Sequence, residues 1–200
     1  MREREREQAS TLWSLLSCHS YSLTPPPIPY QRSAFWPKTV WEPQVSTPEA
    51  AFYVSIPPRL MDLRKPANKE FAVRTLHLLV ADALRHVPAC LTYLSLLETP
   101  QVFAFCAVPQ LMAIATLADV YVRAPLVFTG VVKIRRGLAA RLFLEGIDAS
   151  MSGTVEWYEH FLKIITDASD LNDSADKEVL KAIKKLKAPL AKAARDAKKA

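Results

Sequence analysis

The chain has 200 residues, half of them hydrophobic, which is enough for one domain with a sizeable core and argues against disorder of the whole chain. Its three cysteines are an odd number with no CxxC pair, so the composition indicates neither a disulfide framework nor a thiolate zinc site. The formal net charge is +6, but residues 171–200 hold nine Lys/Arg and four Asp/Glu, a surplus of five that leaves +1 for the rest. The basic character therefore belongs to the C-terminal segment.

Residues 1–64 are predicted to be a mostly irregular, disordered lead-in. Ten of the fifteen prolines lie at or before Pro66, and each removes a backbone donor and fixes φ. The proline-rich run at 25–29 should be extended, either as a bare linker, which we favour, or as a proline-rich recognition peptide. The balanced charges of MREREREQ, followed by a short apolar stretch interrupted by serines, are not typical of a secretory signal.

Residues 65–168 are predicted to be helical, beginning with a helix near Lys69. Pro88 should interrupt this helix or start the next one, which should end at Thr99-Pro100 because a residue before proline is pushed out of the α region. In the first helix, apolar residues recur at three- and four-residue steps, the spacing that stacks side chains on one helical face. These residues are Val73, Leu76, Val80, Leu84 and Val87.

The segment Val102–Tyr121 is apolar nearly all round, which indicates either a helix buried on every side or a membrane span. Pro109 and Gln110 in its middle favour the buried helix, because a protein core can satisfy a lost backbone bond and an amide side chain that lipid cannot. Further helices are predicted over Leu138–Leu144 and from Thr154. The last of these places Trp157, Phe161, Leu162 and Ile165 on one face.

Residues 169–200 are predicted to be a basic helical tail, kinked near Pro189. Its thin apolar stripe consists of Val179, Ile183, Leu186 and Leu190. Because no β-hairpin pattern and no internal repeat occur anywhere in the chain, the predicted class is all-α.

Several segments occur in an order that matches one known family. The run at 103–118 reads FAFCAVPQLMAIATLA, and GVVKIRRG follows at 130–137. Upstream come Phe35-Trp36-Pro37 with Trp41, then Lys65-Pro66-Ala67-Asn68, then Val87-Pro88 with Thr92-Tyr93-Leu94. Together they resemble the C-terminal part of squalene synthases, in the squalene/phytoene synthase family. The resemblance implies a partial isoprenoid-synthase helical fold.

The resemblance also implies roles for particular residues. A prenyl chain needs an apolar tunnel between helices with a few polar groups, and the matching family residues line the substrate cavity: Tyr93, Phe105, Cys106, Pro109, Gln110 and Met112. Without the resemblance, these would be ordinary core residues. Lys133 and Arg135 are two apart, so in an extended segment both cations point to one side and can clamp a diphosphate. In the family they are associated with phosphates of NADPH or the substrate; a solvated basic loop is the alternative.

The parent reaction of the family condenses two farnesyl diphosphates to presqualene diphosphate and reduces it with NADPH to squalene. It requires Mg²⁺ held by two aspartate-rich motifs, because the leaving diphosphate must be neutralised. The motifs should precede the Phe-Trp-Pro element, yet no aspartate occurs before Asp62. We therefore expect no catalytic residue and no metal ligand here, doubtful Mg²⁺ binding, and a fragment that is inactive by itself.

Several other aspartate, cysteine and histidine residues could have a chemical role, but we interpret them as structural. Asp167, Asp170, Asp173 and Asp176 recur every three residues, and we interpret them as a solvated linker with helix-capping aspartates rather than a metal cluster. Cys106, in an apolar run without a histidine partner, is interpreted as a packing residue and not a nucleophile. The remaining candidates form no metal or catalytic set: His77, His86 and His160.

Farnesyl diphosphate is the partner that the family implies. The alternative function is a non-catalytic binding or regulatory module that pairs with a complete synthase or another helical partner, since an exposed half-cavity favours association. The lysine-rich helix could also touch acidic lipid or nucleic acid, but it lacks interleaved aromatic residues, so we favour a solubilising tail and consider nucleic acid unlikely. We expect no transmembrane anchor in residues 167–200, and a location in the cytoplasm or on the cytosolic face of the endoplasmic reticulum.

Overall fold

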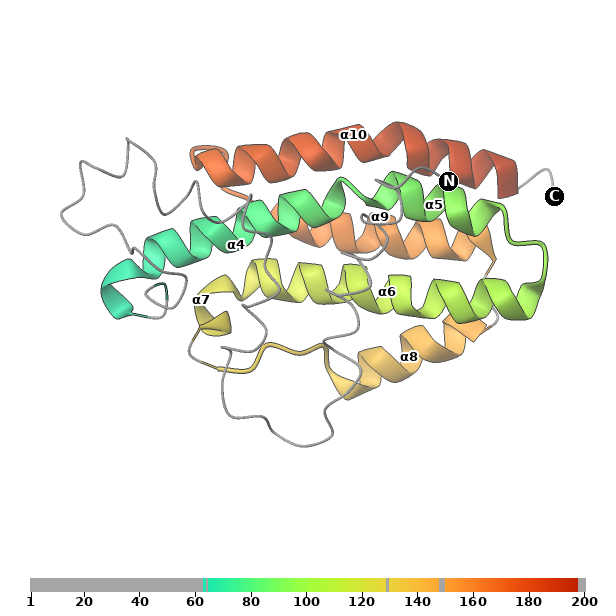
Figure 1. Ribbon diagram of the computed structural model, residues 1–200, viewed down its shortest axis with the longest axis horizontal. Helices are drawn as coiled ribbons and strands as arrows, with labels where there is room; N and C mark the ends of the chain where they lie inside the picture. Colours follow the sequence, from blue (N-terminus) through green and yellow to red (C-terminus); the bar gives the residue numbers. More distant parts are fainter. Residues whose placement is uncertain (1–62, 64, 129, 148–149, 198–200) are drawn as a thin grey trace, which may run out of the picture.

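The structure is a computed structural model that describes residues 63, 65–128, 130–147 and 150–197. Every regular element within these ranges is a helix, which confirms the all-α class (Figure 1). The predicted irregular lead-in, including the Phe-Trp-Pro element, lies outside the described residues except at Leu63. The division at residues 64 and 168 therefore stays a prediction.

The first helices follow the proline and periodicity pattern of the sequence. A 3-10 turn, η3 (Pro66–Asn68), leads into α4 (Lys69–Leu84), whose buried residues include Leu76, Val80 and Leu84. The next helix, α5 (Val87–Ser95), has Pro88 in its first turn, where the missing N–H would have no helical partner anyway. Pro88 therefore starts a helix rather than interrupting one.

The central helix is α6 (Pro100–Val122), which begins at the predicted proline and carries Pro109 in its interior. The short α7 (Ala124–Val127) follows, then α8 (Arg136–Ile147) and α9 (Met151–Asp167). The last of these begins three residues before the predicted Thr154. The reason is a cap, because Ser150 Oγ accepts a hydrogen bond of 3.2 Å from the N–H of Gly153.

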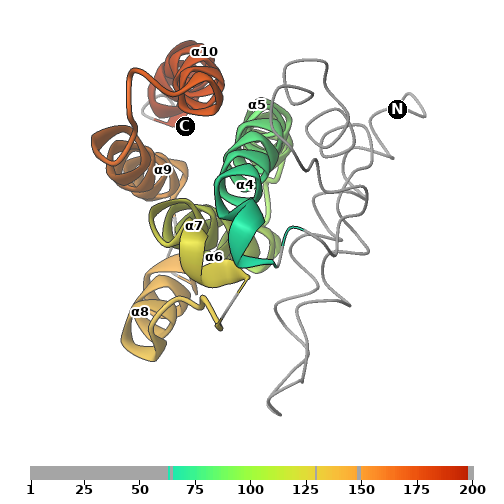
Figure 2. The same ribbon diagram turned by 90° about the vertical axis from the view of Figure 1, so that its left-hand side faces the viewer.

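The C-terminal helix α10 (Ser174–Ala197) packs against α4, α5 and α9 rather than lying apart from them. All four residues of its predicted apolar stripe are buried, and they belong to the same core as residues of α4, α5, α6, α8 and α9. Figure 2 shows α10 at one corner of the bundle, beside α9 and the row of α4 and α5. None of the described helices covers the opposite side of α10.

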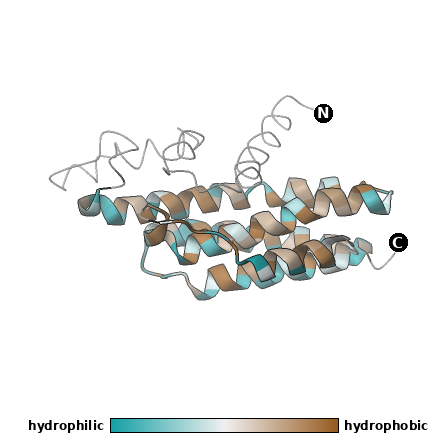
Figure 3. Ribbon diagram, turned by 90° about the horizontal axis from the view of Figure 1, so that it is seen from below, coloured by the Kyte–Doolittle hydropathy of each residue, from teal (hydrophilic) through white to brown (hydrophobic). Residues whose placement is uncertain are grey.

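The helices run along the long axis of the molecule, with α6 between α8 and the row formed by α4 and α5 (Figures 1 and 2). Apolar and polar residues alternate in patches along each of them (Figure 3). α8 lies close to α6 at Gly146, where an added Cβ would lie 2.5 Å from Cγ2 of Val108. A side chain at this position would force the two helices apart.

The expectation that α6 is buried on every side is wrong at its N-terminal half. Val102 is 45% exposed and Phe105 is 72% exposed, because no described helix covers the face on which they lie. By length and composition α6 also qualifies as a helix that can cross a membrane, a test that core helices of soluble proteins pass as well. Another side of α6 packs against α8 and α9, as the buried Leu111, Ile114 and Ala118 show.

Candidate functional site

An exposed apolar surface extends over α5 and the N-terminal half of α6. We call it the α5–α6 face and define it by Tyr93 of α5, by Leu96 at the C-cap of α5, and by Val102, Phe105 and Cys106 on α6. Tyr93 is 50% exposed, and Leu96 and Phe105 are each 72% exposed. The hydroxyl of Tyr93 lies 3.9 Å from Sγ of Cys106, within hydrogen-bonding distance for sulfur. That contact ties the two helices together across this surface.

Most of the predicted cavity residues share this side of α6. Phe105, Cys106, Pro109 and Met112 follow one another at steps of one, three and three residues, which keeps them on one helical face. Phe105 is exposed, and the other three are partly buried. The structure therefore brings these four residues together with Tyr93.

Gln110 lies at the edge of that group and turns toward α9. Its amide oxygen accepts a hydrogen bond of 3.5 Å from the hydroxyl of Tyr158, a fully buried residue of α9. Burial raises the pKa of Tyr158 far above its ordinary value, so the phenol keeps its proton and remains a donor. Gln110 thus connects the candidate cavity residues to the packed core.

Lys133 and Arg135 lie on the irregular segment 131–135 between α7 and α8. Burial alternates there, because Val132 is buried and Ile134 packs against the core while both cations are exposed. The two cationic side chains therefore lie on one side of an extended segment. Neither forms a hydrogen bond or ion pair with another described residue, so both are free to meet an anion.

The same segment is fixed to the end of α6. The guanidinium of Arg123 donates a hydrogen bond of 3.1 Å to the backbone oxygen of Lys133, and it also pairs with Asp119 one helical turn earlier. The pair holds the Arg123 side chain in place. The backbone that carries Lys133 is therefore positioned by the helix that carries Phe105.

The described residues do not fit a magnesium site. Within the described ranges, no three side chains of His, Cys, Asp or Glu gather to hold a metal ion. Asp173 instead caps α10, because its Oδ1 accepts hydrogen bonds from the N–H of Ala175 at 2.7 Å and of Asp176 at 3.2 Å. The capping role predicted for this aspartate is confirmed.

A buried polar cluster joins α4, α6 and α10, and sequence reasoning missed it. Nδ1 of His77 lies 2.5 Å from Oδ1 of Asp176, whose Oδ2 accepts a hydrogen bond of 2.8 Å from the N–H of Asp170. The His77 ring stacks on Tyr121 with 4.2 Å between centroids, and the Tyr121 hydroxyl lies 2.8 Å from Oγ of Ser169. Asp176 is only 4% exposed, so it is not part of a solvated linker as predicted.

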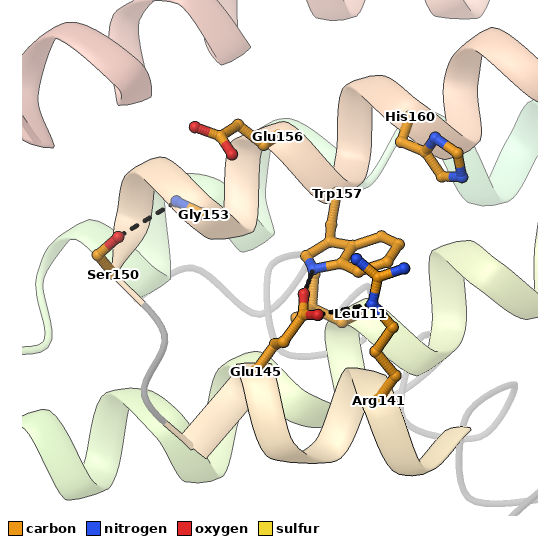
Figure 4. Close-up of a pocket in the computed structure, with 8 residues that line it drawn as sticks. All are labelled: Leu111, Arg141, Glu145, Ser150, Gly153, Glu156, Trp157 and His160. Atoms are coloured by element: carbon orange, nitrogen blue, oxygen red, sulfur yellow. Dashed lines mark hydrogen bonds and ion pairs between the residues drawn. The ribbon is translucent and has the colours of Figure 1, made fainter. Parts of the chain in front are cut away.

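A pocket of about 370 Å³ opens between α8 and α9, and its lining is drawn in Figure 4. Glu145 bonds to Arg141 Nε at 2.6 Å and accepts a hydrogen bond of 2.9 Å from Nε1 of Trp157. The guanidinium of Arg141 also stacks over the Trp157 ring, 5.0 Å from its centroid. The Arg141 hydrogen bond is the main cause that lowers the pKa of the Glu145 carboxyl. These three groups satisfy one another, whereas Glu156 and His160, which also line the pocket, are exposed.

A smaller pocket of about 250 Å³ lies between α4 and α7. Its walls are mostly apolar, from Ala72, Val73, Leu126 and Phe128, and Lys65 and Lys69 also line it. It does not include any of the predicted cavity or phosphate-binding residues.

Comparison with known proteins decides the family. Squalene synthase ERG9 of Candida albicans is 40% identical over 141 residues, which cover 70% of this chain and 29% of that protein. The chain belongs to the squalene synthase family. Human squalene synthase is 37% identical over 152 residues, covering 75% of this chain and 33% of that protein, and squalene synthase 3 of Panax ginseng is 38% identical over 153 residues, covering 76% and 34%. No family model matches the chain.

Solved structures agree on the fold. A structure of TcSQS in complex with the ligand E5700 has a TM-score of 0.69 and 25% identity, covering 94% of this chain and 48% of that one. A complex of TcSQS with BPH1237 has a TM-score of 0.68 and 24% identity, with the same coverage. This squalene synthase-family chain thus spans about a third of the length of the curated relatives it matches and about half of the solved chains.

Proposed function

We propose that the chain forms one wall of a prenyl diphosphate cavity and does not catalyse the squalene synthase reaction by itself. The observation that carries the proposal is the α5–α6 face, where Tyr93 and Phe105 expose aromatic rings on rigid helices next to Cys106. A contiguous exposed apolar surface marks a site where an apolar ligand or a partner binds. A farnesyl chain lying along this face would bury it.

The cationic pair Lys133 and Arg135 is proposed to bind phosphate, either of farnesyl diphosphate or of NADPH. Both side chains are exposed on one side of segment 131–135 and have no partner among the described residues. The guanidinium of Arg135 can donate two parallel hydrogen bonds to phosphate oxygens, and the ammonium of Lys133 adds a point charge. The backbone bond from Arg123 supplies the rigidity that such a contact needs.

The proposed inactivity of the chain alone concerns magnesium. Ionisation of an allylic diphosphate needs a cation that neutralises the leaving group. No aspartate occurs before Asp62, and the described residues gather no metal-binding set. When bound, Mg²⁺ would supply that neutralisation, and we propose that its ligands come from outside these 200 residues.

A second candidate function is a non-catalytic module that pairs with a complete synthase or another helical partner. The same exposed side chains support it, because an amphipathic helix laid along the α5–α6 face would cover them as well as a lipid would. For either function we propose a location in the cytoplasm or on the cytosolic face of the endoplasmic reticulum.

The first test is a turnover assay with the purified chain, farnesyl diphosphate, Mg²⁺ and NADPH. We expect neither presqualene diphosphate nor squalene by mass spectrometry. Product that depends on added protein and disappears with EDTA would refute the proposed inactivity and the magnesium argument together.

The second test supplies the missing part. The remainder of the Candida albicans synthase, made as a separate polypeptide, is mixed with the chain under the same conditions. We expect product, and we expect its rate to fall at least tenfold when Lys133→Gln and Arg135→Gln are combined, because two charge-assisted contacts are lost. Stable association without product favours the non-catalytic module, and no association argues against both functions.

A further inference from the structure

The exposed side of α10 carries a continuous row of cations. Six of them fall within an arc of about 100° when the helix is viewed along its axis, at 3.6 residues per turn. We call this row the α10 ridge and define it by Lys177, Lys181, Lys184, Lys185, Lys192 and Arg195, all of which are exposed. It extends over the 19 residues from Lys177 to Arg195, a length of about 27 Å at the rise of an α-helix.

Few acidic groups neutralise the ridge. Glu178 pairs with Lys181 at 3.2 Å and, more weakly, with Arg85 of α4 at 3.5 Å, while Arg85 also bonds Asp82 at 3.2 Å. Asp196 is exposed beside Arg195, and Asp176 is buried against His77. The other cations of the ridge have no ion-pair partner among the described residues. The ridge therefore keeps a strong positive field at neutral pH.

The opposite side of α10 is committed to the core. Val179, Leu186 and Leu190 are buried against the bundle, and the His77–Asp176 contact holds the start of the helix to α4. The helix therefore cannot roll over and insert an apolar face into lipid in the manner of a free amphipathic helix. What it can offer a partner is a row of positive charge on a helix whose opposite side is packed in the core.

We propose that the α10 ridge attaches the protein to the surface of an anionic membrane through lipid headgroup phosphates. A flat surface can meet these cations together, because all six lie within one arc of about 100° on the exposed side of one helix. Each Lys or Arg held near such a surface strengthens binding about fivefold, so several together give useful attachment without penetration. This inference does not depend on catalysis or on the α5–α6 face.

Nucleic acid fits the same ridge less well, for two reasons. The ridge contains no aromatic residue and no amide that would stack on or read a base. A helix about 10 Å across fills a major groove about 12 Å wide, whereas α10 is flanked by α4, α5 and α9 and cannot enter one. The ridge could touch the phosphates of one strand only.

The test measures binding of the full chain to sedimented vesicles of phosphatidylcholine with 30% phosphatidylserine, against pure phosphatidylcholine, in a low-salt buffer. The ridge variant carries Lys177→Gln, Lys184→Gln and Lys192→Gln. The control variant carries Lys69→Gln, Arg136→Gln and Lys163→Gln, exposed cations on α4, α8 and α9. Both lose three charges, and glutamine keeps the helical propensity of lysine. Helicity at 222 nm should equal that of the unsubstituted chain in both.

We expect binding to the anionic vesicles only, loss on the order of a hundredfold in the ridge variant, and loss of less than about fivefold in the control. High salt should abolish binding by screening. Equal losses in both variants would show that net charge alone is responsible and would overturn the proposal. So would absence of binding to the anionic vesicles, or tighter binding of a short RNA or DNA duplex than of the vesicles in the same buffer.

Discussion

The two sides of α6 differ sharply. On one side Leu111, Ile114 and Ala118 pack against α8 and α9 in a core that extends to α10. On the other side Val102 and Phe105 are exposed together with Tyr93 of α5. One helix therefore serves two purposes, and its uniformly apolar sequence conceals which side is which. The comparison teaches that the packed side accounts for stability and leaves the α5–α6 face available for the proposed binding of a prenyl chain.

The sharpest way to break this comparison uses two phenylalanines. Phe161 of α9 is 3% exposed and Phe105 is 72% exposed. Phe161→Ala should lower the free energy of unfolding by about 3–5 kcal/mol, because it leaves a cavity in the core. Phe105→Ala should change it by less than about 0.5 kcal/mol, because the ring is already in water. Urea unfolding followed by circular dichroism measures both, and a comparable loss at Phe105 would mean that this side is not open.

A pair of aspartates sharpens the comparison. Asp176 lies 2.5 Å from His77 with its side chain 6% exposed, while Asp167 lies 2.5 Å from Lys163 with its side chain 61% exposed. Asp176→Ala should lower the free energy of unfolding by about 3 kcal/mol, because it leaves the largely buried His77 ring without its polar partner. Asp167→Ala should cost less than about 1 kcal/mol, because water solvates the lysine. If the two variants unfold at the same urea concentration, His77–Asp176 does not hold α10 to α4.

Cys90 on α5 gives a pH-dependent test of burial behind the α5–α6 face. Burial raises the pKa of its thiol from 9.0 to about 11. The folded chain therefore keeps a proton that the unfolded chain loses above pH 9, so stability should fall as pH rises from 9 to 11. The contribution of Cys90 at pH 11 should be a loss of about 2 kcal/mol relative to pH 8.

Cys90→Ala removes that titration and nothing else that ionises. The stability difference between the variant and the unsubstituted chain should therefore shift in favour of the variant between pH 8 and pH 11. A difference that stays constant over this range would show that the thiol is solvated.

Two glycines of α8 provide the smallest and most local contrast. Gly146 faces the packed side, where a Cβ would meet Val108 at 2.5 Å, and Gly137 has nothing within 4 Å. Gly146→Ala should destabilise by about 1–2 kcal/mol, since the clash exceeds the gain in helix propensity. Gly137→Ala should be neutral or stabilise by up to about 1 kcal/mol. Adding Val108→Ala to Gly146→Ala should restore part of the lost stability. If it restores none, contact with Val108 is not the cause of the destabilisation.

The helices of the chain could be predicted from local patterns, but the contacts between them could not. The three- and four-residue spacing of Val73, Leu76, Val80 and Leu84 predicted α4, and Pro100 marked the start of α6. The His77–Asp176 contact was missed because the two residues are 99 positions apart and each looks ordinary in its own segment.

The candidate site was predicted by resemblance rather than by periodicity. When a helix is apolar all round, its sequence has no polar stripe that marks the exposed side. The exposure of Phe105 was therefore not predicted. The outward direction of Lys133 and Arg135 could be predicted, because they alternate along the chain with the apolar residues Val132 and Ile134.

The central claim is that the α5–α6 face binds a prenyl chain, and photolabelling tests it most directly. The full chain is irradiated with a benzophenone-bearing prenyl diphosphate, with and without excess farnesyl diphosphate, and the adducts are mapped by mass spectrometry. We predict competed labelling within residues 93–112, lost in Phe105→Ser and kept in Leu171→Ser, whose side chain is also 72% exposed but lies between α9 and α10. Competed labelling that avoids residues 93–112, or labelling that farnesyl diphosphate does not reduce, would contradict the account.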